Sequence, residues 1–295
     1  MALVTATRYN NLRQDVYNVL GTGTGDSGYG QSATSSTVSV AQLVEATNIN
    51  NLYEDIRKCY KHQNGGNPAS NQLQEVVAAD LIVDDDTTTY KGWDQYEALA
   101  LAIATNRLTA HINQIQVQGT SASKTRSSSW NGTITHLFTV TFTDEDERRY
   151  FFNSGGTIRI AASVTGGSAK DSSWNTMLAQ AGTISFGANS TTQASGDPQG
   201  TVGSAVGNYQ LTGTDQYIYQ RIDGGGGAYA ANDYTIEART VSNTQLMFTM
   251  EYRDEAAGNI DETVSNATAT IDSGTAYIDV IGTTPAFAID GTSTL

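Results

Sequence analysis

The stretch ATRYNNLRQD at residues 6–15 returns forty residues later as ATNINNLYED at residues 46–55, with six of the ten positions identical. In both copies the apolar residues recur at spacings of three and four, which predicts two helices with the same apolar stripe. Each predicted helix is only about four turns long and would be marginal in isolation. We therefore expect the stripes to be buried against each other or against neighbouring chains.

These matched stripes are the first candidate for an assembly interface. Two tyrosines in Gly-rich loops join them, because an aromatic side chain in an exposed loop is costly unless a partner surface covers it. Contact with a neighbouring subunit is our first interpretation of the two tyrosines, and contact with a host glycan is the second. The predicted interface comprises Tyr9, Leu12, Val16, Val19, Ile49, Leu52, Ile56, Tyr60, Tyr29 and Tyr229.

A Gly- and Ser-rich stretch, GTGTGDSGYGQSATSSTVSV at residues 21–40, separates the two predicted helices. Its front half is typical of a flexible connector. Gly23, Gly25 and Gly28 have the spacing of a dinucleotide-binding loop, but that fingerprint follows a strand and opens a helix, whereas this one follows a helix. The sequence therefore favours a linker over a nucleotide site.

The pattern is less uniform in the rest of the N-terminal third. Residues 73–83 fit either a helix or a strand, and residues 93–116, rich in Ala and Leu, predict a long helix. The stretch GTSASKTRSSSWNG from Gly119 interrupts the pattern, so we predict a helical docking and oligomerisation region at 1–118 and a β-rich domain at 119–295. Such a segment buries little, and trypsin is expected to cut first at Lys124 or Arg126.

Beyond this boundary the apolar period changes to two. Alternation over residues 133–142 predicts a strand, the acidic residues 144–147 a hairpin turn, and residues 148–153 the start of the return strand. Further strands are predicted at 156–165, 215–222, 233–241, 245–252, 260–271 and 275–281, with a short helix that carries Trp174, Met177, Leu178 and Ala181 on one face. The predicted fold class is α+β, a helical N-terminal third followed by a mostly antiparallel β-sandwich-like domain.

Composition narrows the classes of partner. Lys and Arg total 16 against 30 Asp and Glu, a formal net charge of −14, which disfavours binding to nucleic acid and to anionic lipid. The one dense basic pair, Arg148 and Arg149, lies beside four acidic residues. The single cysteine, Cys59, rules out an intrachain disulfide and reads as a small buried hydrophobe. No apolar run reaches the ~20 residues of a bilayer span, and no signal peptide is recognisable, so we expect a protein made and kept in a reducing cytoplasm.

No catalytic constellation emerges from the sequence. None of His62, His111 and His136 opens an HExxH motif, and there is no G-x-S-x-G elbow. His136 falls on the core side of the predicted strand, which favours a hydrogen-bonded structural histidine. The run 84–86 of three aspartates lacks the spacing of a calcium loop and is interpreted as a solvated acidic loop. We predict no enzyme activity, no cofactor and no metal.

Several blocks carry a resemblance to known proteins. YFFNSGGTIRI from Tyr150, a following Thr-Gly-Gly, Trp174-x-x-Met177-Leu178 and AGTISFG together resemble a block found in structural proteins of tailed bacteriophages. YNNLRQDVYNVLG and NNLYEDI, nearer the N-terminus, resemble virion proteins of contractile-tailed phages that infect cyanobacteria. The resemblance implies a protein synthesised in the host cytoplasm and located in the virion, with copies of itself and other virion proteins as partners.

The predicted function is that of a non-enzymatic, tail-associated structural component, acting in the baseplate, the neck or fibre attachment through contacts between subunits. A carbohydrate-binding adhesin or depolymerase at a tail-fibre tip is the alternative from another class, with host surface glycan as its partner. A depolymerase needs a cleft with convergent carboxylates, and a tip adhesin needs aromatic residues clustered on one exposed face. A capsid decoration protein, the third possibility, differs only in its attachment site.

Overall fold

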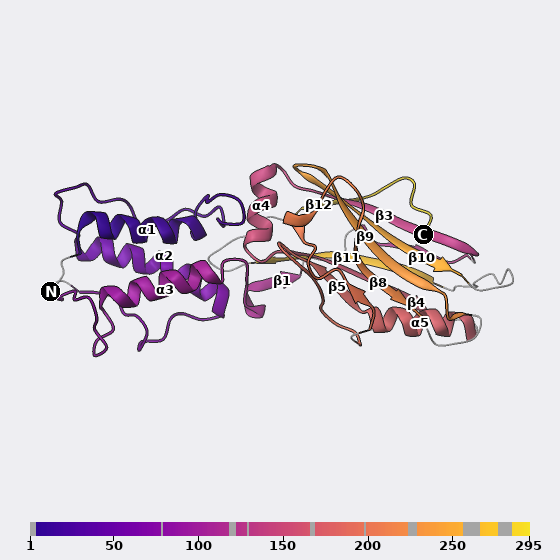
Figure 1. Ribbon diagram of the computed structural model, residues 1–295, viewed down its shortest axis with the longest axis horizontal. Coiled ribbons are helices and arrows are strands. Elements are labelled where there is room, and N and C mark those ends of the chain that lie inside the picture. The colour runs from indigo at the N-terminus through magenta and orange to yellow at the C-terminus, as the bar shows by residue number, and fades with distance from the viewer. Residues whose placement is uncertain are drawn as a thin grey trace. The chain divides into compact units, whose positions relative to one another are not determined.

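The computed structural model describes residues 4–77, 79–117, 122–128, 130–165, 169–197, 199–223, 229–255, 266–276 and 285–295. The chain forms two compact units (Figure 1). The helical unit contains Met1–Gln116 and also Arg149–Gly156, and the β unit contains Val117–Arg148, Thr157–Gly274 and Thr284–Leu295. The predicted α+β class is confirmed, with helices between residues 6 and 105 followed by mostly antiparallel sheets.

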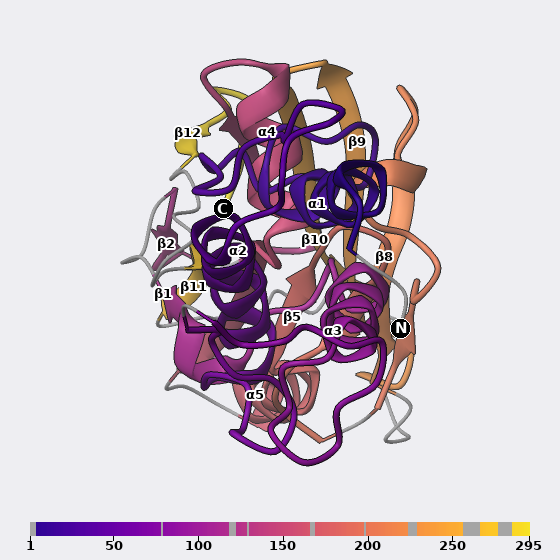
Figure 2. The ribbon, with the colours of Figure 1, turned by 90° about the vertical axis from the view of Figure 1, so that its left-hand side faces the viewer.

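Three helices build the helical unit: α1 (Ala6–Leu20), α2 (Ala46–Asn64) and α3 (Trp93–Thr105). They lie at the corners of a triangle when viewed close to end-on (Figure 2), and each contacts the other two. All three run in the same direction. The Tyr9 hydroxyl near the start of α1 donates to the carbonyl of Asn48 near the start of α2, and the Gln63 amide at the end of α2 donates to the carbonyl of Ile103 near the end of α3.

Parallel helices need long connections that run back along them. The first return segment is residues 21–45 and the second is residues 65–92. The apolar stripes of the helices face inward and form one core, so the repeated stripes are buried against each other, one of the two arrangements expected for them. Burial of each large apolar side chain in this core contributes roughly 2 kcal/mol. Its helical members are Ala6, Tyr9, Leu12, Val16, Val19, Leu20, Ile49, Leu52, Ile56, Cys59, Trp93, Tyr96, Leu99, Ala100 and Ile103.

Local signals set most of the helix ends. The Thr5 side chain caps α1 by accepting a hydrogen bond from the Arg8 amide, and Gly65, with φ of +83°, ends α2. The helix predicted at 93–116 ends at Thr105, so the prediction is wrong for the residues that follow. Ile112, one of the apolar residues that extended the pattern, is largely exposed in a short 3₁₀ turn. Residues 73–77 and 79–83 form neither a helix nor a strand.

Two six-stranded sheets make up the β domain. The first has the order β1-β11-β4-β5-β6, with β2 also pairing with β11, and the second has the order β12-β3-β10-β9-β8-β7. The strands are β1 (Ile115–Val117), β2 (Lys124–Arg126), β3 (Gly132–Thr141), β4 (Thr157–Thr165), β5 (Thr183–Phe186), β6 (Thr191–Gln193), β7 (Thr201–Val202), β8 (Gln216–Ile222), β9 (Asp233–Ser242), β10 (Gln245–Asp254), β11 (Asn266–Ala276) and β12 (Ala286–Ile289). The predicted strands at 215–222, 233–241 and 245–252 are confirmed as β8, β9 and β10. Residues 260–265 and 277–281 of the other predicted strands lie outside the described residues.

The inner faces of the two sheets share a core. Phe138 of β3 is paired with Phe248 of β10, and the rings stack with centroids 5.1 Å apart. Phe186 of β5, in the other sheet, meets the Phe248 ring edge-on with centroids 5.2 Å apart. The predicted short helix is confirmed as α5 (Ala169–Ala181), whose Trp174 packs against Trp130 and against Tyr252 of β10.

Two predictions for the start of this domain are wrong. Residues 145–153 form helix α4 (Glu145–Asn153) rather than a hairpin turn and strand, because the Asp144 carboxylate caps the Glu147 amide and acidic residues favour a first helical turn. The predicted exposed joint at Lys124 and Arg126 is strand β2, paired with β11, and both side chains donate to backbone carbonyls near the C-terminus. No helix among the described residues combines the length and apolar character that a bilayer span requires.

Candidate functional site: the grooves of the helical unit

Besides the apolar stripe, each copy of the repeated phrase carries an asparagine whose side chain binds an extended backbone segment. We call Asn10 and Asn50 the clamp residues. The Asn10 side chain donates to the Val38 carbonyl at 2.8 Å and accepts from the Val38 amide at 2.9 Å. Asn50, its counterpart forty residues later, makes the same pair of bonds with Val76 at 2.8 and 3.0 Å. A carboxamide carries both a donor and an acceptor, so it can pair with a backbone as another strand would. Each copy of the phrase therefore holds the return segment that follows its own helix.

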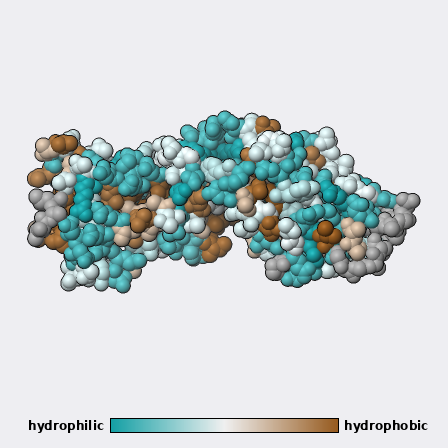
Figure 3. Space-filling view, viewed as in Figure 1, coloured by the Kyte–Doolittle hydropathy of each residue, from teal (hydrophilic) through white to brown (hydrophobic). Residues whose placement is uncertain are grey.

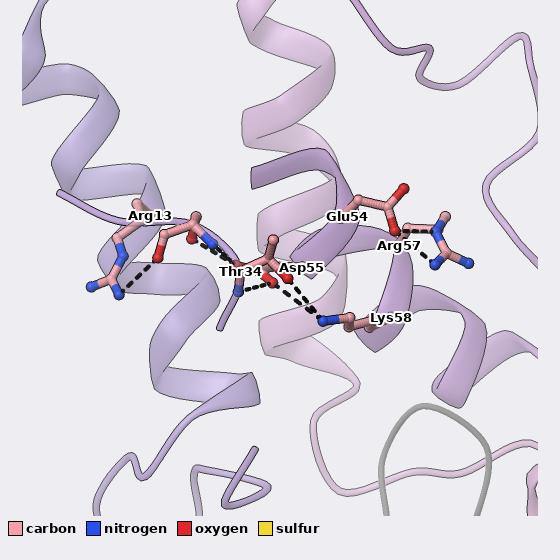
Figure 4. Close-up of polar contacts among 7 residues, drawn as sticks. Arg13, Thr34, Glu54, Asp55, Arg57 and Lys58 are labelled. Atoms are coloured by element: carbon pink, nitrogen blue, oxygen red, sulfur yellow. Dashed lines mark hydrogen bonds and ion pairs between the residues drawn. The ribbon is translucent and has the colours of Figure 1, made fainter. Parts of the chain in front are cut away.

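Asp55 of α2 holds the first return segment from the other side (Figure 4). Its fully buried carboxylate accepts hydrogen bonds from the amides of Thr34 and Ser35 at 2.8 Å each, and from the Ser35 hydroxyl at 2.6 Å. Lys58, one turn further along α2, donates to the Thr34 hydroxyl, and Arg13 of α1 donates to the Ser35 carbonyl. Bonds from both helices show that residues 34–38 fill the groove between α1 and α2, the first groove.

The groove between α2 and α3, the second groove, is filled in a related way. Asn50 of α2 clamps Val76, and the Tyr96 hydroxyl of α3 donates to the carbonyl of Gln74 at 3.3 Å. Residues 74–76 of the second return segment therefore bridge these helices. Two of the three grooves around the bundle are thus covered by the chain's own extended segments.

The groove between α3 and α1, the third groove, is open. It encloses about 620 Å³ and faces the viewer in Figure 3, where hydrophobic side chains gather between the positions of α1 and α3. Leu101 of α3 stands in it with 68% of its surface exposed. The residues that line the third groove are Arg8, Asn11, Leu12, Asp15, Asn18, Val19, Ser27, Glu97, Ala100, Leu101, Ala104 and Arg107.

Charges in the third groove are paired at its ends and unpaired at its middle. Arg8 binds Glu97 at 3.1 Å and also pairs with Asp84, and Arg107 pairs with Asp26 at 2.6 Å. The exposed carboxylate of Asp15 has no hydrogen bond or ion pair with any of the residues that the structure describes. A free acceptor therefore lies between two neutralised ends.

The Gly-rich front of the first return segment is held in place, so its description as a flexible connector is wrong. The amides of Tyr29 and Gln31 donate to the carbonyls of Val19 and Leu20. Gly28 adopts φ of +100°, and a Cβ there would lie 2.3 Å from the Thr22 carbonyl oxygen. Gly28 thus permits a tight turn against the end of α1.

The block YFFNSGG at residues 150–156 and the preceding Arg149 pack against this turn. The sequence did not indicate that these residues belong to the helical unit. Arg149 donates to the carbonyls of Thr22 and Ser27, and the buried Asn153 amide donates to the Gly28 carbonyl at 3.2 Å. Ser154 presents its carbonyl to the His62 ring at 2.8 Å. The aromatic and small residues of the block were visible in the sequence, but nothing local indicated which part of the chain they would meet.

The predicted assembly interface needs correction. Eight of its ten residues, the stripe residues from α1 and α2 and Tyr29, lie in the core of the helical unit and leave no surface for a neighbouring chain. The Tyr29 hydroxyl donates to the Arg107 carbonyl at 2.7 Å and accepts from Gln63 at 2.8 Å, which explains how an aromatic residue in a Gly-rich loop is satisfied without a partner subunit. Tyr60 and Tyr229 are half-buried.

Other singled-out residues have structural roles. His136 is buried and bonds the Ala122 carbonyl at 2.7 Å and the Ser293 hydroxyl at 3.0 Å, as predicted for a structural histidine. Cys59 is buried as predicted, and burial raises the pKa of its thiol. Arg148 is not a surface cation, because its guanidinium is buried and bonds Asn208 at 2.8 Å and the Ser242 carbonyl at 2.9 Å. Among the described residues, no group of three or more His, Cys, Asp or Glu side chains is arranged to hold a metal ion.

Protonation of His62 is expected to destabilise the helical unit. Burial lowers the pKa of His62 to about 4, although the Ser154 carbonyl opposes this shift, and the ring Nδ1 has no partner among the described residues. The ordinary pKa of a histidine is 6.5. Below this pH, His62 binds a proton in the unfolded chain but not in the folded chain. The free energy of unfolding therefore decreases as the pH is lowered to about 4, by about 3 kcal/mol in all.

The measurement is urea unfolding of the wild type and of His62→Gln at a series of pH values from about 7 to 4.5. Burial also lowers the pKa of His136, but this group acts equally in both proteins, so their difference isolates His62. Identical pH slopes in the two proteins would refute the assignment.

Comparisons with known proteins add no relative to this picture: no protein-family model, no curated protein and no solved structure matches the chain.

Proposed function

We propose that the chain is a non-enzymatic structural protein of a phage virion, a tail-associated component of the baseplate, neck or fibre attachment that works through contacts with other virion subunits. The resemblance of the YFFNSGG block and of the repeated NNL phrases to virion proteins motivates this proposal. Its proposed partners are other virion proteins and copies of the chain itself, and its proposed location is the virion.

The observation that carries the proposal is a set of exposed apolar side chains on the two return segments. Val40 and Leu43, two and five residues after the clamped Val38, are 84% and 86% exposed, and Val77 and Leu81, one and five residues after the clamped Val76, are 60% and 64% exposed. Each copy of the repeat therefore presents an apolar pair next to a backbone that two hydrogen bonds fix in place. Apolar side chains held in a defined position on a surface favour a subunit interface, because covering them releases water at little cost in ordering.

The test combines location with substitution. We expect the chain in purified particles of the phage that encodes it, at a symmetric position in a reconstruction of the intact particle. A double variant, Val40→Asp with Leu43→Asp, should fold but fail to enter particles, whereas Val241→Asp, a change at a 47% exposed residue of β9, should enter them normally.

Two results would overturn the proposal. One is the absence of the wild-type chain from purified particles. The other is hydrolysis of host envelope glycan by the isolated chain that a single Asp or Glu substitution abolishes, which would favour a depolymerase. Binding of host glycan without turnover, with loss of binding on substitution of exposed tyrosines, would favour a tip adhesin instead.

A further inference from the structure

The third groove repeats the architecture of the first. The forty-residue offset of the repeated phrase places Asp15 of α1 at the position of Asp55 in α2, Asn18 at the position of Lys58, and Asn11 at the position of Asn51. Asp55 and Lys58 hold the extended segment in the first groove, and Asp15 and Asn18 line the third. The face of α1 that borders the third groove is thus the counterpart of the face of α2 that already binds a backbone.

The opposite wall of the third groove also has its counterpart. Tyr96, Leu99 and Ile103 of α3 have the spacing of Ile49, Leu52 and Ile56 of α2 and are buried in the same core. This correspondence places Glu97 at the position of the clamp residues Asn10 and Asn50. It places Ala100 at the position of Arg13, so the wall of α3 is smaller and leaves more room than the wall of α1.

We propose that the third groove binds an extended segment of a partner protein that runs opposite to the helices and donates two consecutive backbone amides to the carboxylate of Asp15. The segment has small Ser or Thr residues at these two positions, as Thr34 and Ser35 are in the first groove. Leu101 and Ala104 provide an apolar contact for a side chain further along it.

A second copy of the chain is not the expected donor. Its own segments of this kind are already held, the first by Asn10 and Asp55 and the second by Asn50. The partner segment is neutral or basic, because the arginines of the third groove are paired with acidic residues and Asp15 adds a negative charge that no cation among the described residues neutralises.

The probe is a fluorescent peptide with the sequence QSATSSTVSV of residues 31–40, titrated with the full chain and followed by anisotropy. We expect saturable binding that weakens by about tenfold or more in Asp15→Ala, because a charged acceptor of two amides is lost. Leu101→Lys should weaken it similarly by blocking the groove. Ile112→Lys places the same side chain at a 74% exposed residue of the helical unit outside the groove and should leave binding unchanged.

A second peptide, with proline at the positions of Thr34 and Ser35, lacks both amide hydrogens and should bind about tenfold more weakly or not at all. No binding of the first peptide at about 1 mM would overturn the proposal, as would equal affinities in Asp15→Ala and the wild type. Sedimentation decides the remaining alternative: a dimer that Leu101→Lys dissociates would show that a second copy fills the groove. Because the isolated chain is used, the result is independent of any position in a particle.

Discussion

Replacing Leu52 by Asp is expected to unfold the helical unit while the β unit stays folded. Leu52 is fully buried in the core that α1, α2 and α3 share, and none of the described Lys and Arg residues of the helical unit is buried. A carboxylate placed there loses its hydration without gaining a partner, and the loss of packing adds to this cost. The sum, about 5 kcal/mol or more, is comparable with the whole stability of a small unit.

The β unit has a separate core around Phe138, Phe186 and Phe248, so its unfolding transition should persist. Circular dichroism should show the loss of most of the helix signal, that of α1, α2 and α3, with retention of the sheet signal and of α5 in the β unit. Tryptophan fluorescence separates the units further, because Trp93 is in α3 whereas Trp130 and Trp174 are in the β unit. Leu43→Asp makes the same chemical change at an 86% exposed site and should leave both transitions in place. Wild-type helix content in Leu52→Asp would disprove the role of the stripe.

The second large effect is expected at Asp55. Asp55→Ala removes the acceptor of three hydrogen bonds and leaves the Thr34 and Ser35 amides without partners beside α2. We expect a loss of about 3–4 kcal/mol in the free energy of unfolding, since bonds to a charged acceptor are stronger than neutral ones and the orphaned donors lose hydration. The amides of residues 34 and 35 should also change from protected to rapidly exchanging.

The repeat supplies a matched control for this experiment. Asp15→Ala is the same substitution at the same position of the repeated phrase, but Asp15 is exposed and borders the open third groove. Its stability should change by less than about 0.5 kcal/mol, as is usual for surface substitutions. Equal stability losses in Asp55→Ala and Asp15→Ala, or continued protection of the two amides in Asp55→Ala, would contradict the role assigned to Asp55.

These two aspartates show the limit of sequence reasoning about the site. They occupy identical positions in a phrase with six of ten residues conserved between its copies, and nothing in the phrase indicates which carboxylate is buried. The difference arises because a return segment covers one groove and not the other. The repeated Asn10 and Asn50 did carry a signal, since a polar residue repeated beside an apolar stripe suggests a shared structural role, but their partners Val38 and Val76 lie 28 and 26 residues away.

By itself, the sequence determined the features that depend on near neighbours along the chain. Apolar residues at spacings of three and four produced α1, α2 and α5, and strict alternation produced β3 with His136 on its buried side, because a helix turns every 3.6 residues and a strand every two. Only the tertiary structure decided that the helices are parallel, that Tyr29 is buried, and that the YFFNSGG block belongs to the helical unit. Each of these depends on contacts between residues far apart in the chain, whose partners are selected by shape and hydrogen bonding in the folded core and leave no periodic trace in the sequence.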